Sequence, residues 1–154
     1  MSAKIYMQFN DIQGNGTEAE HTNWISLSSC NFSVSRCISQ ESGSEKREIG
    51  IPSLSSLSIT KEMDISSIKM FSESLGGFGS DVCTIHFVNG NGTFLEYKLS
   101  KAVISSYNLH ASEGCATAHE SFTINFTRME TKYMAEKNSP SICAGYDIPT
   151  AKNL

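Results

Sequence analysis

The chain has 154 residues, the length of one ordinary domain, and its formal net charge is −4. No apolar run approaches the roughly 20 residues that a membrane-spanning helix needs. An acidic chain also lacks the Lys/Arg-rich face that binds phosphates. We therefore expect a single domain over residues 1–154, with no membrane insertion and no nucleic-acid partner.

The composition predicts polar but uncharged surfaces. Hydrophobic residues make up 39% of the chain and charged residues only 18%, and Ser, Thr and Asn fill the difference. Many strand positions that face away from a core are therefore neutral and polar. Such faces suit a water-filled surface or a loosely specific interface.

The first residues bear on localisation. The segment Met1–Tyr6 lacks the apolar run of a signal peptide. We expect the protein to be made in the cytoplasm and, if it leaves the cell, to use a route that reads no N-terminal signal.

The N-terminal part predicts two strands with a loop between them. Ile5, Met7 and Phe9 alternate with polar residues, as in a half-buried strand, and the glycine-containing range 11–20 is typical of a loop. Along the second strand, Trp24–Ser35, the apolar residues change phase by one position: Ile25 and Leu27, then Cys30, Phe32 and Val34. This slip indicates a β-bulge, which bends a strand as a curling barrel requires.

The next part predicts a loop, a strand and a helix. The range 39–48 is polar and predicts a long loop, and Pro52–Thr60 predicts a third strand with Leu57 and Ile59 apolar. A helix is predicted over Met63–Gly77, with Asp64 as N-cap and a staple between Met63 and Ile68. Its apolar stripe comprises Ile65, Ile68, Phe71 and Leu75. Gly76 and Gly77 are expected to stop the helix in a left-handed conformation.

The C-terminal half predicts further strands. Val82–Asn89 leads through the turn Asn89–Gly92 into Phe94–His110, which is either one very long strand or a bent pair of strands and whose apolar phase shifts between Leu99 and Ile104. One strand is predicted over Glu120–Tyr133, with Phe122, Ile124 and Phe126 on one face and Thr123, Asn125 and Thr127 on the other. Ile142–Ile148 closes the sheet. The predicted fold class is mainly β: a small, curved, antiparallel β-barrel of two sheets with one capping α-helix.

The chain carries no recognisable catalytic, cofactor or metal motif. Its histidines, His21, His86, His110 and His119, have no metal-ligand spacing, and its five cysteines form no CxxC pair and are expected to be reduced structural thiols. We interpret His86 as a surface residue of a strand. No nucleophile elbow, dinucleotide loop or paired carboxylates are present. We predict no catalytic residue, no cofactor and no metal, and therefore not an enzyme.

Several segments, in their order and spacing, resemble a known family. They are Ile59–Asp64 with Ile65–Ile68 and Gly76, His21 with Trp24–Leu27, Phe94–Tyr97 with Val103–Tyr107, Glu120–Tyr133, and Ala144–Ile148. Together they run over nearly the whole chain and are similar to Hcp, the haemolysin-coregulated tube protein of bacterial type VI secretion.

The resemblance implies a hexameric ring with a wide lumen. Rings would stack into a tube that a contractile sheath drives out of the cell, so the implied partners are other copies, the sheath and spike proteins, and small effector proteins carried inside. The resemblance also implies cytoplasmic assembly followed by secretion without a signal peptide. The implied lumen-facing candidates are Asn31, Ser33, Ser35, Ser53, Ser55 and Ser58. The implied contact loop, which would reach the adjoining subunit or ring, offers Glu41, Glu45, Lys46, Arg47 and Glu48.

Two other functions remain open from the residues alone. The first is a monomeric β-barrel that holds a small ligand or glycan in its mouth. The second is an enzyme whose metal site is assembled from dispersed His and Cys residues.

Overall fold

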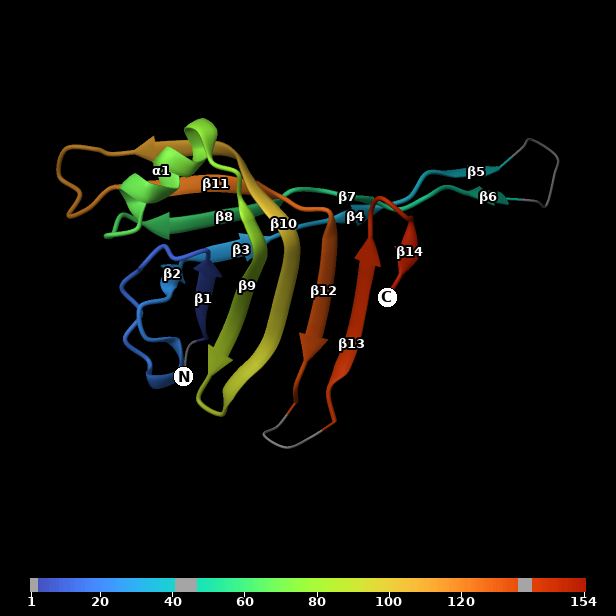
Figure 1. Cartoon of the computed structure of the whole chain (residues 1–154), viewed down its shortest axis with the longest axis horizontal. Helices are drawn as coiled ribbons and strands as arrows, with labels where there is room; N and C mark the ends of the chain where they lie inside the picture. The colour runs from blue at the N-terminus through green and yellow to red at the C-terminus, as the bar shows by residue number, and fades with distance from the viewer. Residues whose placement is uncertain (1–2, 41–46, 136–139) are drawn as a thin grey trace.

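The computed structural model describes residues 3–40, 47–135 and 140–154. Within these ranges the architecture is mainly β, with antiparallel sheets and an α-helix, α1 (Ser67–Gly76), packed beside them (Figure 1). This confirms the predicted fold class. No helix in the described ranges is long and apolar enough to cross a membrane.

The main strands form two sheets, which we call sheet A and sheet B. Sheet A holds, in spatial order, β14 (Lys152–Asn153), β13 (Ile142–Asp147), β12 (Arg128–Tyr133), the first half of β10 (Gly92–His110), β9 (Ser80–Asn89), β1 (Lys4–Phe9) and β2 (Ile25–Leu27). Sheet B holds the second half of β10, β11 (His119–Asn125), β8 (Leu57–Glu62) and β3 (Ser29–Asn31). A short 3₁₀ helix, η1 (Ala19–His21), lies in the loop between β1 and β2.

Strand β10 passes from sheet A to sheet B near Lys101. Leu99 faces the core in sheet A, whereas Ala102 and Ile104 face it in sheet B. Lys101 adopts a positive φ of 52°. Pairing with β9 continues in register through Ala102, pairing with β11 begins at Val103, and the register shift of this second half lies between Ile104 and Ser106. The phase shift predicted between Leu99 and Ile104 therefore marks the point where the strand changes sheets.

The chain crosses between the sheets a second time, between β2 and β3. The N–H of Ser28 at this crossing donates to the Thr60 carbonyl oxygen of sheet B at 2.8 Å. The slip predicted in Trp24–Ser35 is thus confirmed as a bend. Because β10 and the β2–β3 crossing join the sheets at different sides, the strands follow a barrel-like circuit.

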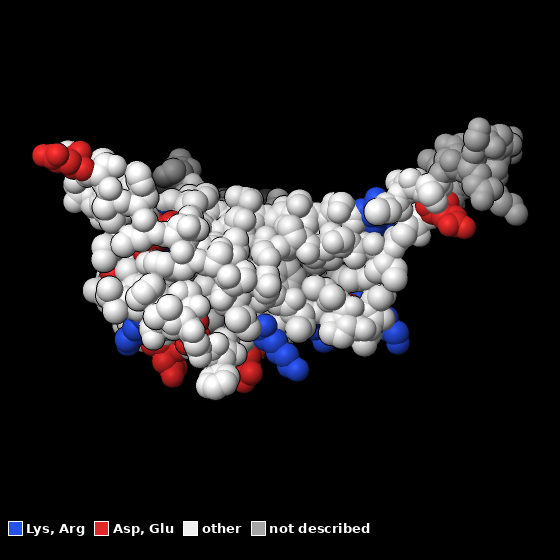
Figure 2. Space-filling view, turned by 90° about the horizontal axis from the view of Figure 1, so that it is seen from above, with Lys and Arg blue, Asp and Glu red and all other residues white. Residues whose placement is uncertain are grey.

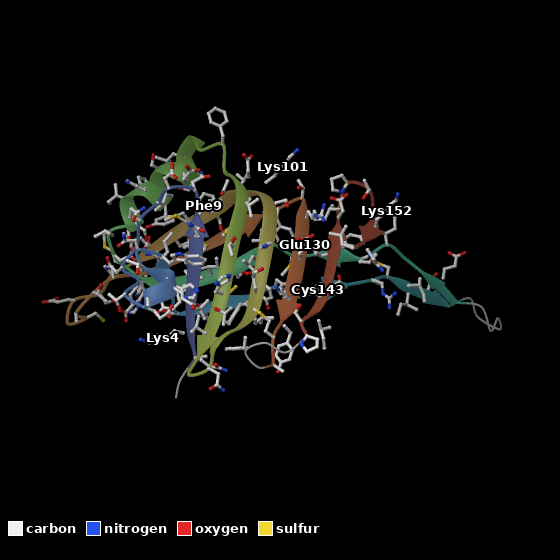
Figure 3. The ribbon with its side chains drawn as sticks, turned by 60° about the horizontal axis from the view of Figure 1, so that its bottom comes forward. Lys4, Phe9, Lys101, Glu130, Cys143 and Lys152 are labelled. Atoms are coloured by element: carbon white, nitrogen blue, oxygen red, sulfur yellow. The ribbon has the colours of Figure 1, made fainter. Side chains whose placement is uncertain are left out.

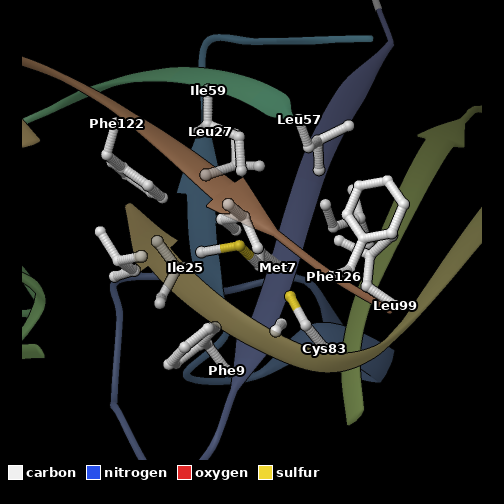
Figure 4. Packing of buried hydrophobic residues seen from close by; sticks show 14 of the residues in the cluster. Met7, Phe9, Ile25, Leu27, Leu57, Ile59, Cys83, Leu99, Phe122 and Phe126 are labelled. Atoms are coloured by element: carbon white, nitrogen blue, oxygen red, sulfur yellow. The ribbon is translucent and has the colours of Figure 1, made fainter. Parts of the chain in front are cut away.

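The hydrophobic core fills the space between the two sheets (Figure 4). Alternate residues of each strand point into it, among them Met7, Phe9, Ile25, Leu57, Ile59, Cys83, Ile85, Leu99, Phe122 and Ile124. Burying one large apolar side chain contributes about 1.5–3 kcal/mol. The predicted alternation at Phe122, Ile124 and Phe126 is confirmed, since all three are buried.

The single strand predicted over Glu120–Tyr133 is wrong, because the segment forms two strands in different sheets. β11 ends at Asn125 in sheet B, and β12 begins at Arg128 in sheet A. Thr127 forms the corner: its N–H and its Oγ1 both donate to the Ser100 carbonyl oxygen, at 3.0 and 3.2 Å.

A hairpin arm projects from the body (Figure 1). β4 (Val34–Ser35) pairs with β7 (Ser53–Leu54) at its base, and β5 (Ile38–Gln40) pairs with β6 (Arg47–Ile49) further out. The loop predicted over 39–48 is therefore wrong at its two ends, which are strands. The predicted strands Trp24–Ser35 and Pro52–Thr60 are likewise divided into shorter ones.

The helix begins later than predicted. Its N-cap position is Ser66, without a side-chain cap, whereas the Asp64 carboxylate accepts the Ser66 N–H in a preceding turn and binds Lys61. The left-handed stop at Gly76 and Gly77 is also wrong, because Gly77 has φ −70° and Gly79 has φ +87°. Gly77 instead allows a close approach of the backbone, since a Cβ there would lie 2.9 Å from the Cα of Glu73.

Candidate assembly surfaces

Sheet B presents an uncharged, hydrogen-bonding surface on the side away from the core, which we call the hydroxyl face. It comprises Ser29, Asn31, Ser58, Thr60, Ser106, Asn108, Ser121, Thr123 and Asn125. Neighbouring strands link these side chains directly: the Ser29 and Thr60 hydroxyls lie 2.6 Å apart, and those of Ser106 and Thr123 lie 2.7 Å apart. The face can therefore border water without burying a charge.

The predicted lumen residues come together in three cross-strand pairs. Asn31 lies opposite Ser58, and Ser35 lies opposite Ser53. Between these pairs, the Ser33 N–H donates to Ser55 Oγ at 2.8 Å. The pairs extend from sheet B along the base of the arm. The prediction missed Thr60, Ser106 and Ser121, although the alternation of polar residues in β11 carried a signal for that strand.

Sheet A presents the opposite kind of surface, which we call the charged face: Lys4, His86, Glu96, Lys98, Arg128, Glu130, Lys132 and Asp147 (Figure 3). Charges of both signs alternate on it, as in the contact of 2.6 Å between Arg128 Nη2 and Glu130 Oε1. Figure 2 shows the charged side chains gathered along one edge of the molecule and at the ends of its projections, with a nearly uncharged edge opposite.

Helix α1 and its flanking turns carry apolar side chains that are largely exposed in the described chain, although the Phe71 ring lies against Tyr107. This helix ridge comprises Ile65, Ile68, Phe71, Leu75 and Phe78, which are 47% to 102% exposed. Their spacing of three or four residues places them along one side of the helix and its flanking turns. The buried side of the helix carries Ser67 and Met70 instead. The predicted apolar stripe is therefore present, but it faces solvent.

An apolar groove lies on the opposite side of the molecule from α1, between the base of the arm and the β12–β13 edge of sheet A (Figure 1). It has a volume of about 270 Å³ and is lined by Phe32, Val34, Pro52, Leu54, Met129, Thr131, Ala144, Gly145, Tyr146 and Asn153. The Tyr146 hydroxyl is buried and has no hydrogen-bond partner among the residues that the structure describes. A single copy thus has an apolar projection at one end and an apolar recess at the other.

A buried polar network holds the segment that leads into α1. Lys61 Nζ donates to Glu120 Oε1 at 2.5 Å and to Asp64 Oδ1 at 3.0 Å, and the side chains of Lys61 and Glu120 are completely buried. Ser67 Oγ and Tyr107 Oη donate to the same Glu120 carboxylate. Burial and the Glu120 carboxylate raise the pKa of Tyr107, so it stays a donor at neutral pH. The network therefore ties β8, β10 and β11 to the start of the helix.

The histidines and cysteines do not gather into a metal site. In the described part of the chain, no group of three or more His, Cys, Asp or Glu side chains is arranged to hold an ion. Burial raises the pKa of Cys30 to about 12, and Cys83 is also buried, whereas Cys37, Cys115 and Cys143 are exposed. His86, interpreted as a surface residue of a strand, lies in β9 on the outward side of sheet A, but it is half-buried there against His21 and Glu96.

Comparison with known families identifies the chain. A model of the family described as type VI secretion system effector, Hcp, matches residues 6–133. The chain belongs to the Hcp family. The resemblance predicted from the sequence is confirmed, and with it the assignment to type VI secretion.

Solved structures of Hcp proteins share this fold. A structure described as a type six secretion system protein matches with a TM-score of 0.91 at 21% identity, covering 99% of this chain and 100% of that one. Hcp1 from Salmonella typhimurium matches with a TM-score of 0.84 at 19% identity, covering 100% of both chains. A chain of the anti-feeding prophage baseplate matches with a TM-score of 0.54 at 12% identity, covering 84% of this chain and 91% of that one. No curated protein matches significantly.

The contact loop that the Hcp resemblance implies lies mostly beyond the described residues. Glu41, Glu45 and Lys46 fall in the range that the structure leaves out, and of Arg47 only the backbone, at the start of β6, is described. Glu48 is exposed and lies opposite Ser39 in the arm. The role of these residues stays a prediction.

Proposed function

We propose that the chain, as one domain over residues 1–154, is a structural, non-catalytic subunit of the inner tube of type VI secretion. It forms hexameric rings that stack. The observation that carries this proposal is the pair of apolar surfaces at opposite ends of one copy, the helix ridge and the apolar groove. Membership of the Hcp family supports the same assignment.

The two apolar surfaces favour head-to-tail contacts. A surface on one end that fits a different surface on the other end gives a heterologous interface, and such an interface closes into a ring when its rotation divides the circle. The occupant of the groove is thus the helix ridge of the next copy. Both surfaces lose water in that contact, and the apolar surface area removed from water stabilises it by about 25 cal/mol per Å².

The polarity of the two sheets sets which side faces inward. The hydroxyl face of sheet B lines the lumen, with Asn31, Ser33, Ser35, Ser53, Ser55 and Ser58 along its border. The charged face of sheet A points outward, toward the sheath. A neutral, hydrogen-bonding lumen would let small effector proteins pass without strong fixed charges. Rings assemble in the cytoplasm behind the spike and leave the cell without a signal peptide.

The test is direct. Size-exclusion chromatography with light scattering should give the mass of six chains, and class averages of negatively stained particles viewed down the axis should show a closed annulus. A single chain at every concentration would overturn the proposal. That result would favour the small-ligand module, for which the apolar groove offers a recess.

The arm provides a second prediction. We propose that the residues that link β5 to β6 and begin β6, namely Glu41, Glu45, Lys46, Arg47 and Glu48, make contacts between rings. Each exposed ion pair contributes only about 0–1 kcal/mol, so many must act together. Deleting residues 43–47 should shorten tubes seen by electron microscopy while leaving the subunit folded by circular dichroism. Tubes of unchanged length would contradict this role.

A further inference from the structure

We propose that two histidines and two carboxylates form an acid-sensitive clasp that holds the loop between β1 and β2 on sheet A. Glu18 and His21 belong to this loop, around η1, while His86 lies in β9 and Glu96 in β10. The clasp therefore joins a loop to two strands that are more than sixty residues away in the sequence.

The four side chains form one continuous line of contacts. Glu18 Oε2 contacts His21 Nδ1, His21 Nε2 lies 2.8 Å from His86 Nδ1, and His86 Nε2 lies 2.7 Å from Glu96 Oε2. Only 1% of His21 is exposed. Both nitrogens of each ring are thus engaged, and the contact between the two rings leaves no room for solvent to replace a lost partner at His21.

Counting protons shows that the clasp is complete in one protonation state. Each of the three contacts needs one proton, two neutral imidazoles supply two, and ionised carboxylates supply none. One ring must therefore be an imidazolium. A fourth proton, on the second ring, would set an N–H of His21 against an N–H of His86. Loss of the third proton would leave one of the three contacts without a proton, with two hydrogen-bond acceptors facing each other.

The surroundings determine which pH opens the clasp. Around the two rings lie Tyr6 of β1, stacked on His21 with centroids 4.9 Å apart, and Lys98 of β10, whose Nζ is 3.6 Å from Glu96 Oε1. Burial lowers the pKa of His86, against the opposing effect of Glu96, and His21 also lowers it. The hydrogen bond to His21 lowers the pKa of Glu18.

The sign of the pH effect follows from these directions. As the pH falls below roughly 6.5, both histidines of the unfolded chain take up a proton, whereas the folded clasp carries one imidazolium and takes up the further proton, on His86, only at lower pH. Because the pKa of His86 is lower in the folded state, stability falls between roughly pH 6.5 and the folded-state pKa of His86. Glu18 adds stability that is present above its unfolded pKa and is lost as the pH falls through its lowered folded one. Mild acid should thus release the loop before the core unfolds.

Trp24 is the single tryptophan of the chain and reports on the clasp. Its ring centroid lies 4.7 Å from that of His21 and 4.9 Å from that of His86. In the full chain, tryptophan emission should change in one step below about pH 6.5. Amide exchange at Gly16 and Trp24, whose hydrogen bonds close the loop, should accelerate roughly tenfold beyond the intrinsic pH effect.

Variants separate the clasp from general acid effects. His86→Gln should abolish the step, and His110→Gln, which changes an exposed histidine elsewhere, should leave it unchanged. Should His86→Gln fail to fold, Glu96→Gln serves instead, and its step should move to lower pH. A flat wild-type titration, or the same step in His86→Gln, would overturn the proposal. The readout is local, so it holds whether or not rings form.

Discussion

Replacing Ile68 and Leu75 together with aspartate is expected to convert rings into single folded subunits. The two side chains are 68% and 73% exposed in one copy, so the substitutions remove little from the core. In the ring they would lie in the groove of the next copy. Fully burying one such side chain contributes about 1.5–3 kcal/mol, and burying a carboxylate there instead carries a further cost.

The expected weakening is large because every interface of the ring is affected. A loss of about 3–6 kcal/mol per contact corresponds to a contact weaker by roughly 10² to 10⁴-fold. Light scattering at a fixed concentration should show the mass of one chain, with an unchanged circular dichroism spectrum.

A matched control lies on the same helix. Lys69→Asp changes the net charge by the same two units, but Lys69 is exposed on a side of α1 away from the helix ridge. It should assemble as the wild type does. If Lys69→Asp dissociates rings equally, charge repulsion and not the ridge is responsible, and if the double variant still forms rings, the ridge lies outside the interface.

The sequence predicted the fold correctly where the residues that a local pattern places on the apolar side of a strand also face the core in the structure. The phase slips around Ser28 and near Lys101 signalled the two sheet crossings, because a strand that passes from one sheet to the other changes which of its residues face the core. The slip from Phe126 to Met129 was the same signal and was missed, so one strand was predicted where two exist.

The errors have non-local causes. Asp64 has the sequence of an N-cap, but Lys61 engages its carboxylate, and the helix begins three residues later. His86 does lie on the outward side of sheet A, as its alternation predicts, yet the distant loop that carries His21 covers it. The helix ridge has the periodicity of a stripe that packs on a core. Periodicity shows that apolar residues share one side of a helix, but it does not show whether other residues cover that side.

For the lumen candidates, the sequence predicted the polar character of each strand but not how the strands pair. Cross-strand pairing of Asn31 with Ser58 and of Ser35 with Ser53 could not be read from spacing, since the segments are separated by the arm. The polar alternation itself was visible in each strand. Sequence therefore supplied the chemistry of the face, and strand pairing supplied its continuity.

Glu120→Ala is expected to lower the free energy of unfolding by about 3–5 kcal/mol, the loss typical of removing one partner from a buried ion pair. The substitution leaves Lys61 buried without the carboxylate that lies 2.5 Å from its Nζ. It also removes the acceptor of Ser67 and Tyr107. Urea unfolding followed by circular dichroism should show the midpoint fall with an unchanged slope.

Two comparisons give this result its meaning. Ser121→Ala changes the next residue of β11, on the hydroxyl face, and should alter stability by no more than about 0.5 kcal/mol. Lys61→Met combined with Glu120→Leu removes both charges of the pair and should recover part of the loss, because the Asp64 carboxylate loses its cation but still accepts the Ser66 N–H. Equal losses for Glu120→Ala and Ser121→Ala would mean that the buried pair does not hold the helix. If the loss is as large as expected, Glu120→Ala should also weaken rings, because Ser67 begins the helix that carries the ridge and the network fixes its position.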